Sequence, residues 1–322
     1  MTSSTTYDYV LIDCHLLCYS SWWPVRELTN SSGTPTGLEF GFIKNVLTSV
    51  RRWIPAKLVL VWDGFPSRCN TIYPKVVVNG VESGYKSNRQ KHEDKEAEPP
   101  WRPRLERMRK CFEPLVTTLY DPQTEADEQI ARFVFKANRE GKKCVIISKD
   151  KDMHQLVSEN THLCMGAEEN LLTEVDIQEL WGVPPHKVPL RRAVEGDGSD
   201  RIKGIPRMPK TVIIEMVNNS ANISELILNA GKFTKSKTQL DKMMEPNDPI
   251  TGELRGRDLI KRNYQLSEML TQANLEPTIS SLPEENLGDV TLVNSLIQEI
   301  ESSTLMKRPE WRILQKDTTV MI

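Results

Sequence analysis

The chain has 322 residues, of which 38% are hydrophobic, with 42 Lys and Arg against 44 Asp and Glu and a formal net charge of −2. This composition supports a globular core in one large or two modest domains and excludes collagen-like, low-complexity and disordered classes. Apolar runs such as Val145-Ile146-Ile147 are far shorter than the roughly 20 residues of a membrane helix. Residues 1–4 lack the features of a signal peptide, so we expect a cytoplasmic protein without a membrane span.

The six cysteines are scattered without a C-x-x-C pair, and a chain of this size needs no disulfide bonds to fold. Cys14 and Cys18 lie four residues apart, but no neighbouring His or Cys completes the four ligands of a zinc site. We expect reduced, buried thiols.

Three near-continuous apolar runs, at residues 9–12, 58–62 and 144–147, are typical of strands buried on both faces of a parallel sheet. Between the first two, apolar residues recur at helical spacing and predict an amphipathic helix over residues 37–53. Thr124-Glu125-Ala126-Asp127 resembles a capping box and predicts a helix whose inner face is Ile130, Val134 and Ala137. The alternation predicts a doubly wound, mostly parallel α/β domain.

Residues 64–100 are polar and Lys-rich, too long for an ordinary connection, and predict an inserted mobile loop. Beyond residue 166, helices are predicted at 174–181, 186–196 and 210–218. Residues 276–288 are rich in Ser, Pro and Glu and precede an amphipathic stretch with Leu292, Leu296 and Ile300. The expected domains are an α/β core over 1–180 with an insertion at about 64–110, a helical region over 181–275, and a linker, final helix and tail over 276–322.

Positive charge is concentrated in two segments. Residues 67–110 contain eleven Lys and Arg and six acidic residues, and residues 187–210 contain seven Lys and Arg and three acidic residues. The net charge of the chain argues against a uniformly basic nucleic-acid binder, so any such contact is expected from these two segments.

Aspartates follow each predicted strand, and acidic pairs occur in two further segments. The residues are Asp13, Asp63, Asp150 with Asp152, Glu125 with Asp127, and Asp197 with Asp200. Any one of them is most simply a helix cap or a turn residue. Together they predict one cleft, because ligands bind outside the carboxyl ends of strands in open α/β sheets.

So many carboxylates in one cleft repel one another unless cations bind, and oxygen ligands without Cys or His favour Mg²⁺ or Mn²⁺. The chain contains no P-loop, no G-x-G-x-x-G after the first strand and no G-x-S-x-G. A metal-assisted phosphoryl reaction remains, in which two ions roughly 3.5–4 Å apart activate a water and stabilise the leaving oxygen.

In order and spacing, several segments between residues 7 and 215 resemble the 5′-nuclease (flap endonuclease) family, in particular bacteriophage 5′-3′ exonucleases and the N-terminal nuclease domain of bacterial DNA polymerase I. The segments are Val10-Leu11-Ile12-Asp13, residues 28–36, Val61-Trp62-Asp63-Gly64, Tyr85-Lys86-Ser87-Asn88-Arg89, Glu125-Ala126-Asp127, Ser148-Lys149-Asp150-Lys151-Asp152 and residues 196–210. The resemblance implies a PIN-like 5′-nuclease core with a helical arch insertion and a helix-three-turn-helix-like hairpin.

The resemblance further implies that all eight carboxylates hold two Mg²⁺ ions, with Mn²⁺ as a substitute, and that Asp150 is among the catalytic residues. Cleavage near a 5′ end would leave a 5′-phosphate and a 3′-hydroxyl. Lys86 and Arg89 match the catalytic basic residues at the foot of the arch: Lys86 would neutralise charge on the scissile phosphate and Arg89 would clamp it. Tyr85 would stack on a base.

Residues 202–210 occupy the place of the family's duplex-binding hairpin, but Arg207 and Pro209 stand where its second glycine pair is expected. Because prolines 206 and 209 lack an amide N–H, phosphate contact is assigned to Lys203, Arg207 and Lys210. Binding of K⁺ at this hairpin stays open.

The expected function is a structure-selective 5′ nuclease acting on 5′-ended, nicked or flapped DNA and on RNA-DNA hybrids, in primer removal during phage replication or repair. We expect a monomer in the host cytoplasm that acts alone or with a replication clamp or single-strand-binding protein. Two alternatives stay open: a catalytically silent branched-DNA-binding protein on the same fold, and a PIN-like ribonuclease, which would need neither the arch nor residues 196–210.

Overall fold

The computed structural model of the chain describes residues 6–54, 56–78, 81–87, 101–167, 170–234, 236–281 and 290–314. The chain divides into two compact units. The first comprises Met1–Phe65, Lys95–Thr173 and Thr271–Ile322, and the second comprises Pro66–Asp94 and Glu174–Leu270. The expected division differs in that part of the insertion belongs to the second unit and the C-terminal segment belongs to the first.

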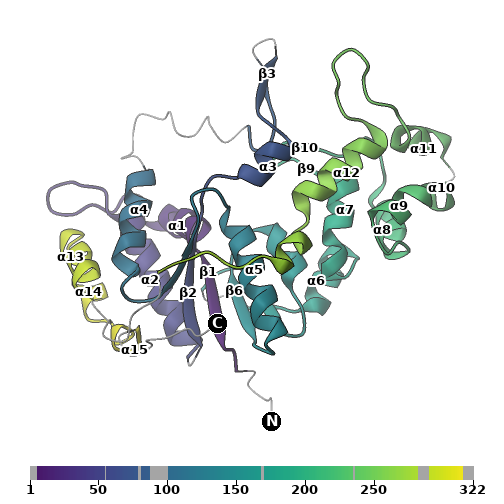
Figure 1. The fold of residues 1–322 in the computed structure, drawn as a ribbon. Coiled ribbons are helices and arrows are strands. Elements are labelled where there is room, and N and C mark those ends of the chain that lie inside the picture. Colours follow the sequence, from purple (N-terminus) through teal and green to yellow (C-terminus); the bar gives the residue numbers. More distant parts are fainter. Residues whose placement is uncertain are drawn as a thin grey trace. The chain divides into compact units, whose positions relative to one another are not determined.

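The first unit is built on a sheet that contains seven strands within the described residues, in the order β11-β5-β2-β1-β6-β7-β8. Figure 1 labels its central strands β1, β2 and β6. The strands are β1 (Tyr9–Asp13), β2 (Lys57–Trp62), β5 (Thr117–Tyr120), β6 (Cys144–Ile147), β7 (Thr161–Cys164), β8 (Leu171–Leu172) and β11 (Ile279–Ser281). The five inner strands are parallel, and β8 and β11 pair antiparallel at the edges. The three predicted strands are confirmed.

The strand order places a topological switch point between β1 and β6. From β1 the chain moves outward through β2 and β5, then returns to β6 on the other side of β1. The loops that leave β1 and β6 therefore diverge, which opens a crevice at the carboxyl ends of these strands where ligands bind in doubly wound folds.

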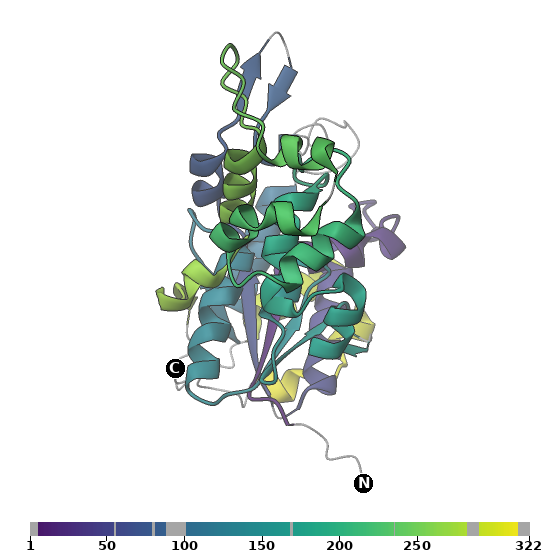
Figure 2. The ribbon, with the colours of Figure 1, turned by 90° about the vertical axis from the view of Figure 1, so that its right-hand side faces the viewer.

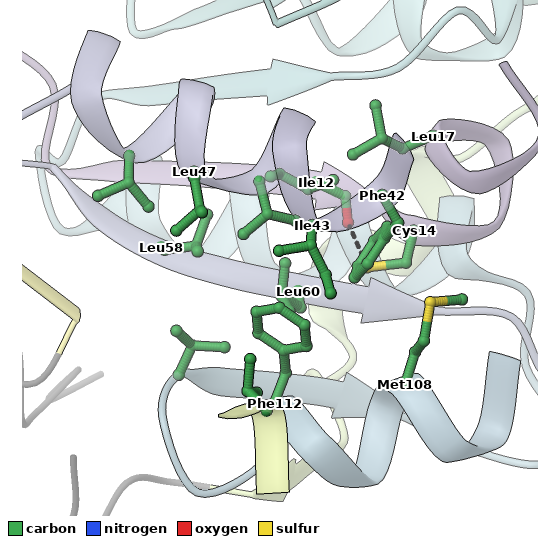
Figure 3. Packing of buried hydrophobic residues seen from close by; sticks show 14 of the residues in the cluster. Ile12, Cys14, Leu17, Phe42, Ile43, Leu47, Leu58, Leu60, Met108 and Phe112 are labelled. Atoms are coloured by element: carbon green, nitrogen blue, oxygen red, sulfur yellow. Dashed lines mark hydrogen bonds between the residues drawn. The ribbon is translucent and has the colours of Figure 1, made fainter. Parts of the chain in front are cut away.

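Helices cover both faces of this sheet. On one face, α1 (Cys14–Trp22), α2 (Gly37–Arg52) and α4 (Trp101–Phe112) bury apolar side chains against β1 and β2, where Phe42, Ile43 and Phe112 meet Ile12 and Leu60 (Figure 3). On the other face, α5 (Ala126–Arg139) packs with its Phe133 ring edge-on to Tyr9 at 5.1 Å. The predicted inner face of α5, Ile130, Val134 and Ala137, is fully buried.

The C-terminal segment returns to the core of the first unit. Helices α13 (Thr291–Glu299), α14 (Ser303–Met306) and α15 (Trp311–Leu314) contribute Leu296, Leu305 and Trp311 to the same apolar cluster as α2 and α4. The amphipathic stretch predicted as the final helix forms α13, whose apolar residues are buried by the core of the first unit; α14, α15 and the strand β11 (Ile279–Ser281) were not expected. Leu292, predicted on the apolar face, is exposed, whereas Leu296 and Ile300 are buried.

The second unit is mainly helical. Its helices are α3 (Ser67–Ile72), α6 (Glu174–Trp181), α7 (Val188–Glu195), α8 (Lys210–Asn218), α9 (Ile223–Leu228), α10 (Ala230–Phe233), α11 (Lys237–Met243) and α12 (Gly256–Ser267), with a short antiparallel pair, β9 (Gly196–Asp197) and β10 (Ile202–Lys203). The predicted helices near 174–181, 186–196 and 210–218 are confirmed. Short 3-10 helices η1 (Trp23–Val25), η3 (Lys151–Leu156), η4 (Pro185–Lys187) and η5 (Leu270–Asn274) complete the described elements.

The predicted loop at 64–100 is wrong over residues 67–83. Helix α3 forms because Cys69 packs with Tyr85, Ile202 and Leu266, and the valine-rich segment pairs as β3 (Val76–Val78) with β4 (Val81–Ser83), seen as two blue arrows in Figure 2. Residues 88–100 of that prediction lie outside the described residues. No helix in the described part of the chain is long and apolar enough to cross a membrane.

The position of α13 in the core predicts a contrast between two leucines on this helix. Leu296→Ala removes a side chain that is 1% exposed and should lower the free energy of unfolding by about 2–5 kcal/mol, because it leaves a cavity. Leu292→Ala, at a side chain that is 48% exposed, should cost under about 1 kcal/mol. Urea unfolding of both variants checks this, and equal small effects would show that α13 does not pack on the core.

Candidate active site

The carboxyl ends of β1 and β6 are joined by hydrogen bonds across the switch point. Asp13, the last residue of β1, caps α1 by accepting the Leu16 N–H at 3.2 Å on Oδ1. Its Oδ2 accepts the Ser148 hydroxyl at 3.0 Å, and Ser148 Oγ in turn accepts the Asp150 N–H at 3.0 Å. One serine therefore orients the Asp13 carboxylate and fixes the backbone that carries Asp150.

Asp63, directly after β2, is fixed by the N-terminus of α5. Its Oδ1 accepts the Ala126 N–H at 2.7 Å, while its own N–H donates to His15 Nδ1 at 3.1 Å. The predicted capping box is wrong: the cap residue is Glu125, and Thr124 Oγ1 donates instead to Asp121 Oδ2. Asp63 takes over this role because parallel strands β2 and β5 bring the end of β2 beside the start of α5.

Asp63 and Asp150 both act electrostatically on Asp13. The pKa of Asp13 is raised to about 7, first because burial disfavours its charged form and then because of the negative charge of Asp63 and, more weakly, of Asp150. The hydrogen bonds from Leu16 and Ser148 oppose this rise in pKa. Such a group is poorly stabilised as an anion unless a cation binds beside it.

The remaining predicted ligands of the first unit lie at the same edge of the sheet. Glu125 is buried at the start of α5, and Asp127 lies in the first turn of that helix. Asp150 caps η3 by accepting the Asp152 N–H at 2.9 Å. The fold thus brings six predicted ligands, Asp13, Asp63, Glu125, Asp127, Asp150 and Asp152, to the carboxyl ends of β1, β2 and β6.

By the chemistry of its donor atoms, though not by their spacing in this structure, this edge fits a hard divalent cation, since it consists of carboxylate oxygens around the buried Asp13. In the described residues, no three His, Cys, Asp or Glu side chains are grouped closely enough to hold a metal ion.

Asp197 and Asp200 lie in the second unit: Asp197 is the last residue of β9, and Asp200 lies in the turn between β9 and β10. Asp197 Oδ1 accepts the N–H and hydroxyl of Ser199 at 2.9 and 2.6 Å, and Asp197 forms an ion pair with Arg192 of α7. Asp200 is buried, and its backbone carbonyl accepts the Lys86 N–H at 3.2 Å. The second unit therefore ties this acidic turn to the start of the predicted arch motif.

Tyr85 and Lys86 differ in exposure. The Tyr85 ring is 3% exposed and packs on Cys69, Ile202 and Leu266, while Lys86 Nζ lies 4.7 Å from the centre of that ring. The burial of the Tyr85 ring contradicts its predicted stacking on a base. The ring packs inside the protein, with the Lys86 ammonium group beside it. Arg89 lies outside the described residues.

The predicted phosphate-binding side chains follow the acidic turn. Lys203 pairs with Glu253 at 2.6 Å and Lys210 lies 3.6 Å from Glu195, but both side chains are largely exposed. Arg207 is exposed at a positive φ of 60°. Gly204 is required between them, because a Cβ there would lie 2.1 Å from the Glu195 carbonyl oxygen.

Sequence reasoning missed Ser148, His15 and Arg192 as parts of this arrangement. Ser148 had a weak signal, since it stands between a buried strand and an acidic pair. His15 and Arg192 had no sequence signal, because the fold alone brings them to their partners, Asp63 and Asp197.

A parallel α/β fold with acidic side chains at its switch point is the class expected of metal-dependent phosphodiesterases. Residues 8–182, more than half of the chain, match the family model described as "5′-3′ exonuclease, N-terminal resolvase-like domain". The chain therefore belongs to this 5′-3′ exonuclease family. As a member of this family it is a 5′ nuclease of the metal-dependent phosphodiesterase class, and a two-metal mechanism is characteristic of the family.

Curated relatives agree with this membership. The chain is 29% identical over 225 residues to a 5′-3′ exonuclease of Buchnera aphidicola, covering 70% of this chain and 74% of the relative. It is 24% identical over 302 residues to a 5′-3′ exonuclease of Aquifex aeolicus, covering 92% and 93%. A match to Thermus aquaticus DNA polymerase I, 28% identical, covers 70% of this chain and 25% of the polymerase.

Solved structures share the fold at low sequence identity. A bacteriophage T5 flap endonuclease, solved as a pseudo-enzyme-product complex with DNA and metal ions, has a TM-score of 0.64 and 13% identity, covering 96% of this chain and 98% of that one. The catalytic core of Rad2 in complex with DNA substrate has a TM-score of 0.53 and 14% identity, covering 96% and 93%.

The two hydrogen bonds of the Ser148 hydroxyl predict an effect on activity larger than on stability. Ser148→Ala should reduce metal affinity or cleavage by about 10- to 100-fold, because Asp13 and the Asp150 backbone lose their common partner. Ser20→Ala, whose hydroxyl bonds only the Leu17 carbonyl of its own helix, is the control. Equal activities of the two variants would contradict this role of Ser148.

Proposed function

We propose that the chain hydrolyses phosphodiesters near the 5′ ends of flapped, nicked or 5′-ended DNA and of RNA-DNA hybrids, with two Mg²⁺ ions as cofactors. The observation that carries the proposal is the placement of Asp13, Asp63 and Asp150 at or just after the carboxyl ends of β1, β2 and β6, at the switch point of a 5′-3′ exonuclease family fold. The T5 and Rad2 structures, whose descriptions include DNA, support the substrate class.

The eight predicted carboxylates are assigned as the metal-holding residues, six in the first unit and Asp197 and Asp200 in the second. When bound, divalent cations would lower the pKa of a water and stabilise the leaving oxygen of the phosphodiester. Another solved structure with this fold is a T5 5′-exonuclease with bound zinc ions, which supports divalent metal binding here. The choice of Mg²⁺ follows from the all-oxygen donor set.

The side chains of this chain divide the remaining tasks. Leu16 N–H and Ser148 hold Asp13 through its two oxygens, and Ala126 N–H holds Asp63. Lys86 is proposed to neutralise charge on the scissile phosphate, with Arg89 clamping the same group. These fixed donors keep the carboxylates oriented despite their mutual repulsion.

Duplex DNA is proposed to contact Lys203, Arg207 and Lys210 through phosphates, without base recognition. Because Lys203 and Lys210 are paired with exposed or half-exposed acids, phosphates would replace Glu253 and Glu195 as their partners. We further propose a monomer that serves primer removal in phage replication or repair, in the host cytoplasm, with a replication clamp or single-strand-binding protein as partner.

Cleavage of two substrates tests the activity. The purified chain should cut a 5′-labelled flap, a 5′-recessed RNA-DNA hybrid, or both, with Mg²⁺ and not with EDTA, because phosphate cleavage here depends on cations among the carboxylates. Denaturing gels give the product lengths and rank the substrates. Binding of the flap without cleavage under both Mg²⁺ and Mn²⁺ would instead support a catalytically silent junction binder.

Asp150→Asn should lower flap cleavage by at least about 100-fold while leaving flap affinity nearly unchanged, since it removes a charge from the metal-holding edge. Asp8→Asn is the matched control, because Asp8 precedes β1 at the opposite end of the sheet and pairs with Lys142. Single-turnover cleavage and equilibrium binding separate the two effects. Loss of binding at unchanged turnover would show that Asp150 serves the DNA contact.

Metal should also stabilise the fold. Mg²⁺ at ten to one hundred times its dissociation constant should raise the free energy of unfolding by about 1.4–2.7 kcal/mol, because it relieves repulsion between Asp13, Asp63 and Asp150. The shift should shrink in Asp150→Asn. Thermal unfolding with Mg²⁺ and with EDTA measures it, and an equal shift in Asp150→Asn would place the ion elsewhere.

A further inference from the structure

Asp197 is held in the structure by a positively charged side chain of its own unit. Arg192 on α7 is 6% exposed and forms an ion pair with Asp197 Oδ2. The other oxygen, Oδ1, accepts both the N–H and the hydroxyl of Ser199. Both oxygens of this predicted metal ligand are therefore already engaged by donors within the chain.

The Asp13 carboxylate is held differently. Its two oxygens accept hydrogen bonds from the Leu16 N–H and the Ser148 hydroxyl, which are neutral donors. A neutral donor orients a carboxylate and leaves its negative charge uncompensated, whereas a guanidinium cancels that charge. The attraction for an incoming cation is therefore weaker at Asp197 than at Asp13.

Burial makes the competition at Asp197 stronger. The side chains of Arg192 and Asp197 are 7% and 16% exposed, so little water screens their attraction. A divalent ion that binds Asp197 Oδ2 has to displace this guanidinium or share the oxygen with it. Displacement would break this buried ion pair, which is costly.

We propose that Arg192 is the resident counter-cation of Asp197, and that it makes the metal position served by residues 196–200 the weaker of the two. The inference rests on the proposed two-metal function. Arg192 is a positioning residue, since it acts through Asp197. The expected effect of Arg192 is that the metal position at residues 196–200 fills only at a higher concentration of the divalent ion than the position at Asp13, Asp63 and Asp150.

The neighbouring Arg191 supplies a matched control. It lies on the same helix, is equally buried, pairs with Glu195 and lies over the Trp181 ring at 5.1 Å. Neutralising Arg191 removes a buried charge from α7 without touching the ion pair at Asp197. A general destabilisation of α7 would affect both variants, whereas loss of the counter-cation affects only Arg192 variants.

The test is calorimetric titration of the metal-free full chain with Mn²⁺, for wild type, Arg192→Gln, Arg191→Gln and Asp197→Asn. Wild type should bind two ions of unequal affinity, and Asp197→Asn should lose or weaken the second. Arg192→Gln should lower the dissociation constant of the second ion about tenfold, which corresponds to the loss of one competing charge-assisted hydrogen bond. The dissociation constant of the first ion should stay unchanged. Arg191→Gln should match wild type.

Arg192→Lys covers the case in which Arg192→Gln does not fold. Lysine keeps the charge but lacks the planar fork of arginine, so the second ion should bind about two- to threefold tighter than in wild type. Unchanged or weaker binding of the second ion in the folded Arg192 variants would overturn the proposal, because Arg192 would then only support the turn.

Flap cleavage by the same proteins separates the two proposals. If wild type does not cleave but Arg192→Gln tightens the second ion, the proposed function fails and the role of Arg192 stands. If wild type cleaves and Arg192→Gln leaves Mn²⁺ binding unchanged, the role of Arg192 fails alone. A wild-type chain that binds no Mn²⁺ overturns both.

Discussion

Repulsion between the buried carboxylate of Asp13 and its acidic neighbours is the constraint on which the site depends. Asp13 ends β1, and Asp63 and Asp150 follow β2 and β6 of the same parallel sheet. Burial first, and then the charges of Asp63 and Asp150, raise the pKa of Asp13. The sheet holds them together because β1 lies between β2 and β6 and all three end at the same edge. The register of these strands, stabilised by the apolar residues on both faces, therefore maintains an arrangement that electrostatics alone would disperse.

The same side chains also accept hydrogen bonds from the backbone at the starts of helices. Asp13 caps α1, Asp150 caps η3, and Asp63 accepts the first N–H of α5. A helix cap and a metal-holding carboxylate are compatible, because one oxygen accepts the backbone N–H and the second remains available for another partner. At Asp13 that second partner is Ser148, a neutral group. Capping thus fixes the orientation of each carboxylate without cancelling its charge.

Local patterns were sufficient to predict the strands β1, β2 and β6 and the helices α2, α5, α6, α7, α8 and α13, because apolar runs or helical spacing are clear in these segments. Strands β5 and β7 escaped prediction because Thr117, Thr118, Thr161 and His162 interrupt their apolar character. The cap of α5 escaped it because the acceptor, Asp63, lies 63 residues earlier in the chain. The aspartates could be named from their position after strands, but Ser148, His15 and Arg192 depend on pairings that only the fold defines.

The contrast between Asp13 and Asp197 follows from where each carboxylate stands. Asp13 ends a central strand and is surrounded by backbone amides, hydroxyls and other carboxylates, so a cation from solution is the available neutralising charge. Asp197 follows a helix, α7, whose last two turns carry Arg191 and Arg192. The helix can therefore supply the charge itself, and a turn held in this way keeps its shape before any ion binds. Under the proposal made above, the cost of this arrangement is that Asp197 competes less well for a metal ion than Asp13, whose partners are neutral donors.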